Sequence, residues 1–175
     1  GLKEENVMQE GNYQAIGETC GIQIKYASYE TNNFNGIFSS NSEYLSLINL
    51  ARVRQISAEE QFNRNEHLSW ISKNKLIGIE KEINNYKSAH NLIDFTDMIQ
   101  QFLDKGTTPK FKVIFVDEAQ DLSLIQWAMI DKIERETECD VWIAGDDDQA
   151  IFGWAGADVD SFINWKSREI LLDKS

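Results

Sequence analysis

The stretch that decides the fold is Phe111-Lys112-Val113-Ile114-Phe115-Val116, a short β-branched and aromatic run that ends in Asp117-Glu118. Such a run is typical of a strand buried in a parallel sheet. A second run, Val141-Trp142-Ile143-Ala144, follows after a segment of helical character from about Ser123 to Glu136. Strand, helix and strand within about 30 residues predict a βαβ unit, in which the two strands run parallel.

Segments on both sides extend this unit. Ile170-Leu171-Leu172 is a third candidate strand. Upstream, apolar residues at helical spacing predict helices over residues 44–51, 76–88 and 95–102, and Gly106 is expected to end the last of these. A capping box at residues 57–60 predicts the start of another short helix.

The first forty residues have weak periodicity, and turn signals stand at Gly11-Asn12, Asn32-Asn33 and Asn35-Gly36. We expect short helices and loops there. The sequence therefore predicts an α/β protein with a mostly helical subdomain over residues 1–88, followed over residues 89–175 by part of an open parallel sheet.

The composition describes a folded, acidic protein. Of the 175 residues 42% are hydrophobic, and 29 Asp and Glu stand against 17 Lys and Arg, a net charge of −12. The hydrophobic content excludes a wholly disordered chain, and the charge argues against a general polyanion-binding surface. No apolar run approaches the roughly 20 residues that span a bilayer, so we expect no membrane contact and a cytoplasmic location. The two distant Cys residues indicate neither a zinc site nor a disulfide.

The acidic residues gather in the second half, where residues 91–175 hold 18 acidic and 8 basic side chains. Asp117-Glu118 ends the first predicted strand, and Gly145 with Asp146-Asp147-Asp148 follows the second. Because the carboxyl ends of parallel strands share one sheet edge, we expect these side chains in one crevice. An Asp there can hold Mg²⁺ and a Glu can take a proton from water, which suits nucleotide hydrolysis.

Each acidic cluster also has a plainer interpretation. Asp117 and Glu118 can solvate a strand end or cap the helix that follows. The Asp triplet can form a turn or offer oxygen ligands to a hard cation, although it lacks the alternating acidic positions of an EF-hand loop. On the residues alone these alternatives stay open.

Three segments in order resemble one known family. Asp117-Glu118-Ala119-Gln120-Asp121 and residues 145–158, Gly-Asp-Asp-Asp-Gln-Ala-Ile-Phe-Gly-Trp-Ala-Gly-Ala-Asp, resemble motifs II and III of superfamily 1 helicases of the UvrD, Rep and PcrA group. Residues 92–99 resemble the aspartate-phenylalanine segment upstream of motif II. The chain also resembles helicase-like proteins of bacteriophages. The resemblance implies a partial RecA-like P-loop NTPase sheet, preceded by the helical insertion of the first motor domain.

The resemblance also implies roles for single residues. Asp117 would help hold Mg²⁺, Glu118 would activate the hydrolytic water, and Gln149 would sense the γ-phosphate, so that these three contact ATP. Phe152 and Trp154 would face DNA, where an aromatic face stacks on any unpaired base without reading sequence. Core packing is the alternative for both aromatic residues, and for Phe152 the two interpretations weigh about equally.

Two departures from the family pattern stand out. Relatives commonly have Arg after the motif III tryptophan, where this chain has Ala155, which puts that cation's contacts in doubt. The phosphate-cradling pattern GxxxxGK[ST] does not occur in the 175 residues, the nearest pair being Lys105-Gly106. In the family that loop lies upstream of the motifs found here, and the arginine-bearing motifs of the second motor domain lie downstream of them. We therefore expect a fragment that is inactive alone, with basic DNA-binding surfaces in other domains.

The leading hypothesis is a piece of an ATP-dependent DNA helicase that moves on single-stranded DNA and unwinds duplex junctions, with 3′ to 5′ polarity resting on the resemblance alone. The alternative is a helicase-like interaction module without catalysis. The parent reading frame distinguishes the two, because an enzyme would have an upstream GKT or GKS and downstream arginine motifs. A metal-dependent nuclease also fits the acidic residues but leaves Gln149, Phe152 and Trp154 without roles.

Overall fold

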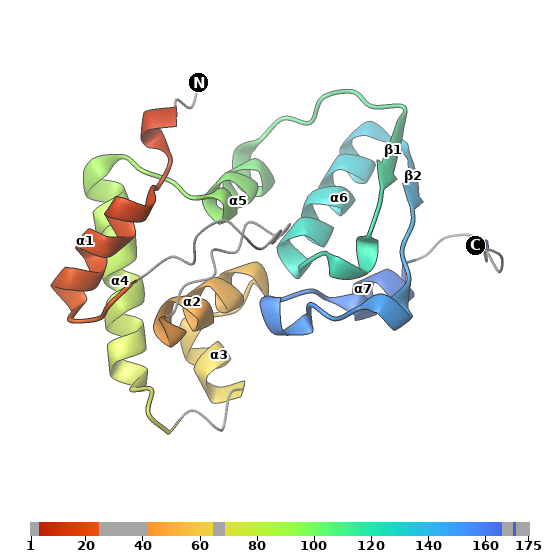
Figure 1. The fold of residues 1–175 in the computed structure, drawn as a ribbon. Coiled ribbons are helices and arrows are strands. Elements are labelled where there is room, and N and C mark those ends of the chain that lie inside the picture. Colours follow the sequence, from red (N-terminus) through yellow and green to blue (C-terminus); the bar gives the residue numbers. More distant parts are fainter. Residues whose placement is uncertain (1–3, 25–41, 65–68, 166–169, 171–175) are drawn as a thin grey trace.

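The computed structural model describes residues 4–24, 42–64, 69–165 and 170. Helices precede a small parallel sheet, as the sequence predicts, and Figure 1 shows the helices α1 to α4 on one side of the molecule and the sheet with α6 on the other. None of the helices in the described residues is long and apolar enough to cross a membrane.

In the residues that the structure describes, the helical part contains four α-helices around one apolar core. They are α1 (Glu10–Cys20), α2 (Glu43–Val53), α3 (Ala58–Arg64) and α4 (Lys73–His90). Their buried side chains include Ile16, Leu45, Ile48, Leu76 and Ile79. The apolar residues recur every three or four positions, so each helix presents one stripe to this core.

The expected helix signals at Ser57 and Gly106 are confirmed, whereas the caps of α4 are not predicted by the sequence and this helix ends two residues after Ser88. Ser57 accepts a hydrogen bond from the backbone N–H of Glu60 at 3.1 Å just before α3. Ser72 caps α4 by accepting from Lys75 N at 3.4 Å, and Asn91 ends that helix in the left-handed conformation. The helix α5 (Phe95–Lys105) stops at Gly106, the predicted residue.

The sheet consists, within the described residues, of β1 (Val113–Val116) and β2 (Asp140–Ile143), which pair in parallel with Val113 opposite Asp140. The helix α6 (Leu124–Thr137) connects them and covers one face. Trp127 and Ile130 on α6 pack against the sheet side chains and against Phe162 of α7 (Val159–Ile163). The predicted βαβ unit is therefore present.

The expectation of strands buried in a parallel sheet is wrong for one face of this sheet. Exposure alternates along β1 and β2, and Phe115 and Trp142 are 78% and 55% exposed, with ring centroids 6.4 Å apart. Strand side chains alternate between the two faces of a sheet, and among the described residues α6 covers only one face. The apolar run predicted a strand correctly, but it did not predict that one face of the strand would be exposed.

The turn expected at Gly11-Asn12 is also wrong. Both residues lie in the first turn of α1, where Asn12 Oδ1 accepts a hydrogen bond from Gln9 N at 2.7 Å. Asn is favoured in turns and at helix starts because its side chain can bond the backbone in both places, which explains the error. The signals at residues 32–36 and the candidate strand residues 171–172 lie outside the described residues, and Ile170 is not part of a strand.

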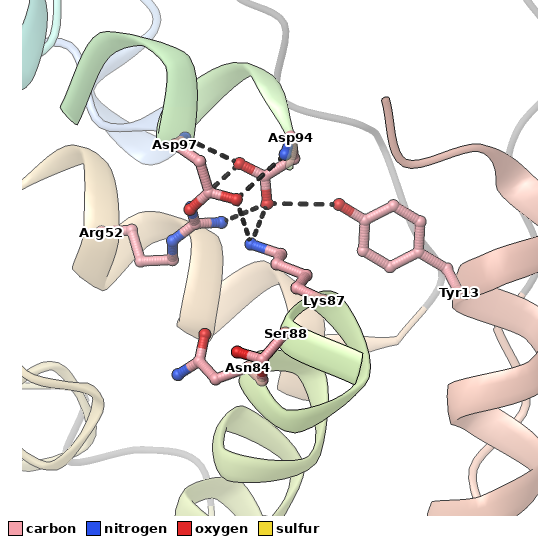
Figure 2. A network of polar contacts seen from close by, with 7 residues as sticks. All are labelled: Tyr13, Arg52, Asn84, Lys87, Ser88, Asp94 and Asp97. Atoms are coloured by element: carbon pink, nitrogen blue, oxygen red, sulfur yellow. Dashed lines mark hydrogen bonds and ion pairs between the residues drawn. The ribbon is translucent and has the colours of Figure 1, made fainter. Parts of the chain in front are cut away.

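A buried ionic network joins the helical part to α5. Asp94 caps α5 and lies 2.6 Å from Arg52 of α2 and 2.5 Å from Lys87 of α4, while Asp97 lies 2.7 Å from Lys87 (Figure 2). The Tyr13 hydroxyl donates to Asp94 at 3.5 Å. Burial alone would raise the pKa of the Asp94 carboxyl, but the bonds and charges of Arg52 and Lys87 hold it well below its usual range. The aspartate-phenylalanine segment thus has a structural role.

Candidate functional site

Two candidate residues end strand β1. Asp117 and Glu118 follow Val116 directly, and both are exposed at the carboxyl edge of the sheet. Asp117 Oδ1 accepts from Glu118 N at 3.0 Å, and Glu118 has φ 50°, a left-handed conformation that is uncommon for a residue with a side chain. The Glu118 side chain makes no capping bond to the short helix η2 (Ala119–Asp121). The helix-capping interpretation of Glu118 is therefore not supported.

The acidic triplet follows β2 and forms a turn. Asp146 caps the short helix η3 (Asp147–Gln149) by accepting from Asp148 N at 3.1 Å. Its other carboxylate oxygen accepts from the Gln149 amide at 2.5 Å. Gln149 is thus held at the loop surface, on the same sheet edge as Asp117 and Glu118.

Gln120 connects these two loops, a role that the sequence analysis does not assign. Its amide nitrogen donates to Glu118 Oε2 at 2.8 Å, and its Oε1 accepts from Asp146 N at 3.0 Å. The side chain is 1% exposed. A continuous chain of hydrogen bonds therefore runs from Glu118 through Gln120 and Asp146 to Gln149. A buried glutamine can bridge two loops because its amide both donates and accepts.

Gly145 makes room for this bridge. A Cβ atom at this position would collide with Gln120 Oε1 and would lie 3.0 Å from the Phe162 ring. The glycine between the end of β2 and the acidic triplet is therefore required by close approach of a side chain, not by an unusual backbone angle. The glycine in the sequence could suggest a close approach at this position, but the sequence could not show that Gln120 is the residue that approaches.

The aromatic residues lie in the loop that follows. Trp154 is 69% exposed, which contradicts core packing for this residue. Phe152 is half-buried, with its ring centroid 6.4 Å from that of Trp154 and the ring planes tilted by 53°. The core interpretation thus keeps partial support for Phe152 alone.

The aromatic loop is anchored on both sides. Asp158 N donates to Leu122 O at 2.8 Å, which ties the loop to the segment after Glu118. On the other side Gly156 has φ 102° and packs against α2, where an added Cβ would lie 2.5 Å from Val53 Cγ2. The loop that carries Trp154 is therefore held by a backbone hydrogen bond on one side and by packing against α2 on the other.

The acidic edge can accept a hard cation. Asp117 keeps one carboxylate oxygen outside its bond to Glu118, while burial and the charge of Glu118 raise the pKa of Asp121. One Asp121 oxygen is buried without a hydrogen-bond partner in the described residues. Within that part of the chain no three metal-ligating side chains converge. This donor set fits Mg²⁺, which commonly binds one or two carboxylates together with phosphate oxygens and water.

Comparisons with known proteins agree on one family. Residues 5–169 match the family described as UvrD/REP helicase N-terminal domain. Similar proteins include the ATP-dependent DNA helicase Rep of Buchnera aphidicola, 32% identical over 47% of this chain and 14% of the relative. A probable DNA helicase of Mycoplasma pneumoniae is 37% identical over 45% and 16%. PcrA of Staphylococcus aureus is 23% identical over 69% and 17%. The matched part thus spans less than a fifth of each of these relatives.

Proposed function

This chain belongs to the UvrD/REP helicase N-terminal domain family, and we propose that it is part of an ATP-dependent DNA helicase, in which it links ATP hydrolysis to movement on single-stranded DNA. The observation that carries the proposal is the hydrogen-bonded path from Glu118 through Gln120 and Asp146 to Gln149. The path continues along the chain into the loop of Trp154. ATP hydrolysis at the sheet edge and single-stranded DNA at the aromatic loop would therefore act on the same few residues.

Glu118 is proposed as the general base. Its Oε2 is held by the Gln120 amide, which leaves Oε1 to take a proton from a water molecule. A carboxylate that is oriented by a buried partner needs little reorganisation when the proton moves. Asp117, one residue earlier, would hold Mg²⁺, which when bound neutralises phosphate charge.

Gln149 is proposed as the sensor of the terminal phosphate. Its amide nitrogen donates to Asp146, so an anion at the sheet edge would compete with Asp146 for that donor. Loss of this bond would release Gln149 from the Asp146 carboxylate that also caps η3, and the residues after Gln149 lead within a few positions to Trp154. A rearrangement of this short segment is the proposed means of coupling.

Trp154 and Phe152 are proposed to contact the strand. The exposed indole offers a stacking surface that any base can use, worth about 1 to 3 kcal/mol per base. Unpaired DNA next to a duplex junction is the proposed substrate, and 3′ to 5′ movement rests on the family resemblance alone.

The 175-residue chain is proposed to lack ATP hydrolysis on its own, because the sequence contains no GxxxxGK[ST] loop to cradle the phosphates. Titration calorimetry with ATP and Mg²⁺, together with a turnover assay, tests this. Sub-micromolar affinity or steady turnover would contradict it. The longer protein should bind ATP and hydrolyse it faster with single-stranded DNA, and an inactive longer protein would instead favour an interaction module.

A further inference from the structure

Arg54 reaches from the helical part to the aromatic loop. It follows the last residue of α2, and its Nη2 donates to the backbone carbonyl of Gly153 at 3.2 Å. Its Nη1 donates to Gln61 Oε1 at 3.2 Å, and Gln61 is fully buried. The guanidinium is therefore fixed beside Gly153, the residue that precedes Trp154, although Arg54 and Gly153 are 99 positions apart in the sequence.

The charge of Arg54 is not paired with a carboxylate among the described residues. By contrast, Arg52, Arg64 and Arg135 each form an ion pair with an acidic side chain. A guanidinium has five N–H donors, and the two contacts of Arg54 are to neutral oxygens. Burial and the nearby charge of Arg64 lower the pKa of Arg54, while Asp158 raises it. A half-buried, unpaired cation is unusual in a chain with net charge −12.

The surroundings of Arg54 suit a strand backbone. Trp154 is 69% exposed and Ile151 is 68% exposed on the same loop. Because the guanidinium lies on the carbonyl of Gly153, the residue before Trp154, a nucleotide whose base stacks on Trp154 would have a phosphodiester within reach of Arg54. Arginine binds phosphate oxygens through two parallel N–H bonds more readily than other side chains do.

We propose that Arg54 binds a phosphodiester of the single strand whose base stacks on Trp154. The inference rests on the proposed function, since it requires that Trp154 contacts DNA. It adds a charged contact from the helical part, so that one site is completed by two regions of the chain. The carbonyl of Gly153 and the amide of Gln61 orient the guanidinium for that contact.

The test is the salt dependence of oligothymidine binding by the longer protein that contains this chain. Each phosphate neutralised on a single strand contributes about 0.7 to the slope of log K against log salt. Arg54→Gln should therefore lower the magnitude of the slope by about 0.7, whereas Arg54→Lys should keep the slope and bind more weakly. Arg135→Gln is the matched control, since Arg135 is exposed, lies at the far end of α6 and should leave the slope unchanged.

Trp154→Ala separates this inference from the proposed function. It should weaken binding at every salt concentration and leave the slope unchanged. If Trp154→Ala binds as tightly as the wild type, the proposed DNA path fails. If Trp154→Ala weakens binding but Arg54→Gln shows the wild-type slope, only the phosphate contact is overturned. Thermal melts check that each variant is folded, and Arg54→Met, which keeps the apolar stem, replaces Arg54→Gln if the latter unfolds.

Discussion

Gln120 accepts a hydrogen bond from the backbone N–H of Asp146 at 3.0 Å, which joins the loop after β1 to the loop after β2 through a buried side chain. The same amide donates to Glu118. The position of the proposed base is therefore set by the start of the aromatic loop. This bridge connects the two loops through a side chain, in addition to the backbone bond from Asp158 N to Leu122 O.

The bridge predicts a coupling between two substitutions. Gln120→Ala leaves the Asp146 N–H without its partner and should lower the free energy of unfolding by about 1 to 3 kcal/mol. Gly145→Ala forces a methyl group against the Gln120 amide and should destabilise by about 1 to 3 kcal/mol. In the double variant the clash with Gln120 is gone and only the close approach to the Phe162 ring remains, so the loss measured by urea unfolding should be smaller than the sum by at least about 0.5 kcal/mol. Strict additivity would contradict the bridge.

Trp154→Ala should weaken single-strand binding by about 1 to 3 kcal/mol while leaving the melting temperature close to that of the wild type, because the indole is exposed. DNA-stimulated ATP hydrolysis should fall more than basal hydrolysis. Trp70→Ala is a control for the loss of an exposed indole, since Trp70 is 62% exposed and precedes α4 in the helical part. A lowered melting temperature together with loss of all activities would instead support core packing of Trp154.

The network around Asp94 predicts an acid dependence of stability. The pKa of Asp94 is lowered in the folded chain, so its contribution is present above the unfolded value of about 3.9 and is lost as pH falls below it. Asp94→Asn keeps a capping side chain but leaves Lys87 and Arg52 short of a charge partner, which should cost about 3 to 5 kcal/mol at pH 7. Urea unfolding from pH 7 to pH 3 should show a shallower decline for this variant. Parallel declines would contradict the assignment.

The sequence predicts elements well where one strong local signal decides them. The run at residues 111–116, the helical spacing of residues 95–102 and the glycine at 106 all mark structures that the fold contains. Gly11-Asn12 was ambiguous because an Asn side chain satisfies the backbone equally in a turn and in the first turn of a helix. Local patterns also do not reveal what covers a strand, which is why the exposure of Phe115 was not foreseen.

In the candidate site, too, local signals in the sequence identify some residues and long-range contacts determine others. Asp117, Glu118 and Gln149 lie at one edge of the sheet, where the strand ends and the family motifs place them, and their roles stay predictions, as does the DNA contact of Phe152 and Trp154. Gln120 and Arg54 could not be predicted, since their partners, Asp146 and Gly153, lie 26 and 99 positions away. Such contacts depend on how loops and helices pack, and neither periodicity nor motif spacing contains that information.

Glu118→Gln in the longer protein tests the central claim most directly, because the amide keeps the shape of the side chain and removes the base. ATP binding, measured by calorimetry, should stay close to the wild-type value, and steady-state turnover should fall by far more than tenfold. Retention of more than about a tenth of wild-type turnover, a barrier change below about 1.4 kcal/mol, would contradict the proposed role of Glu118.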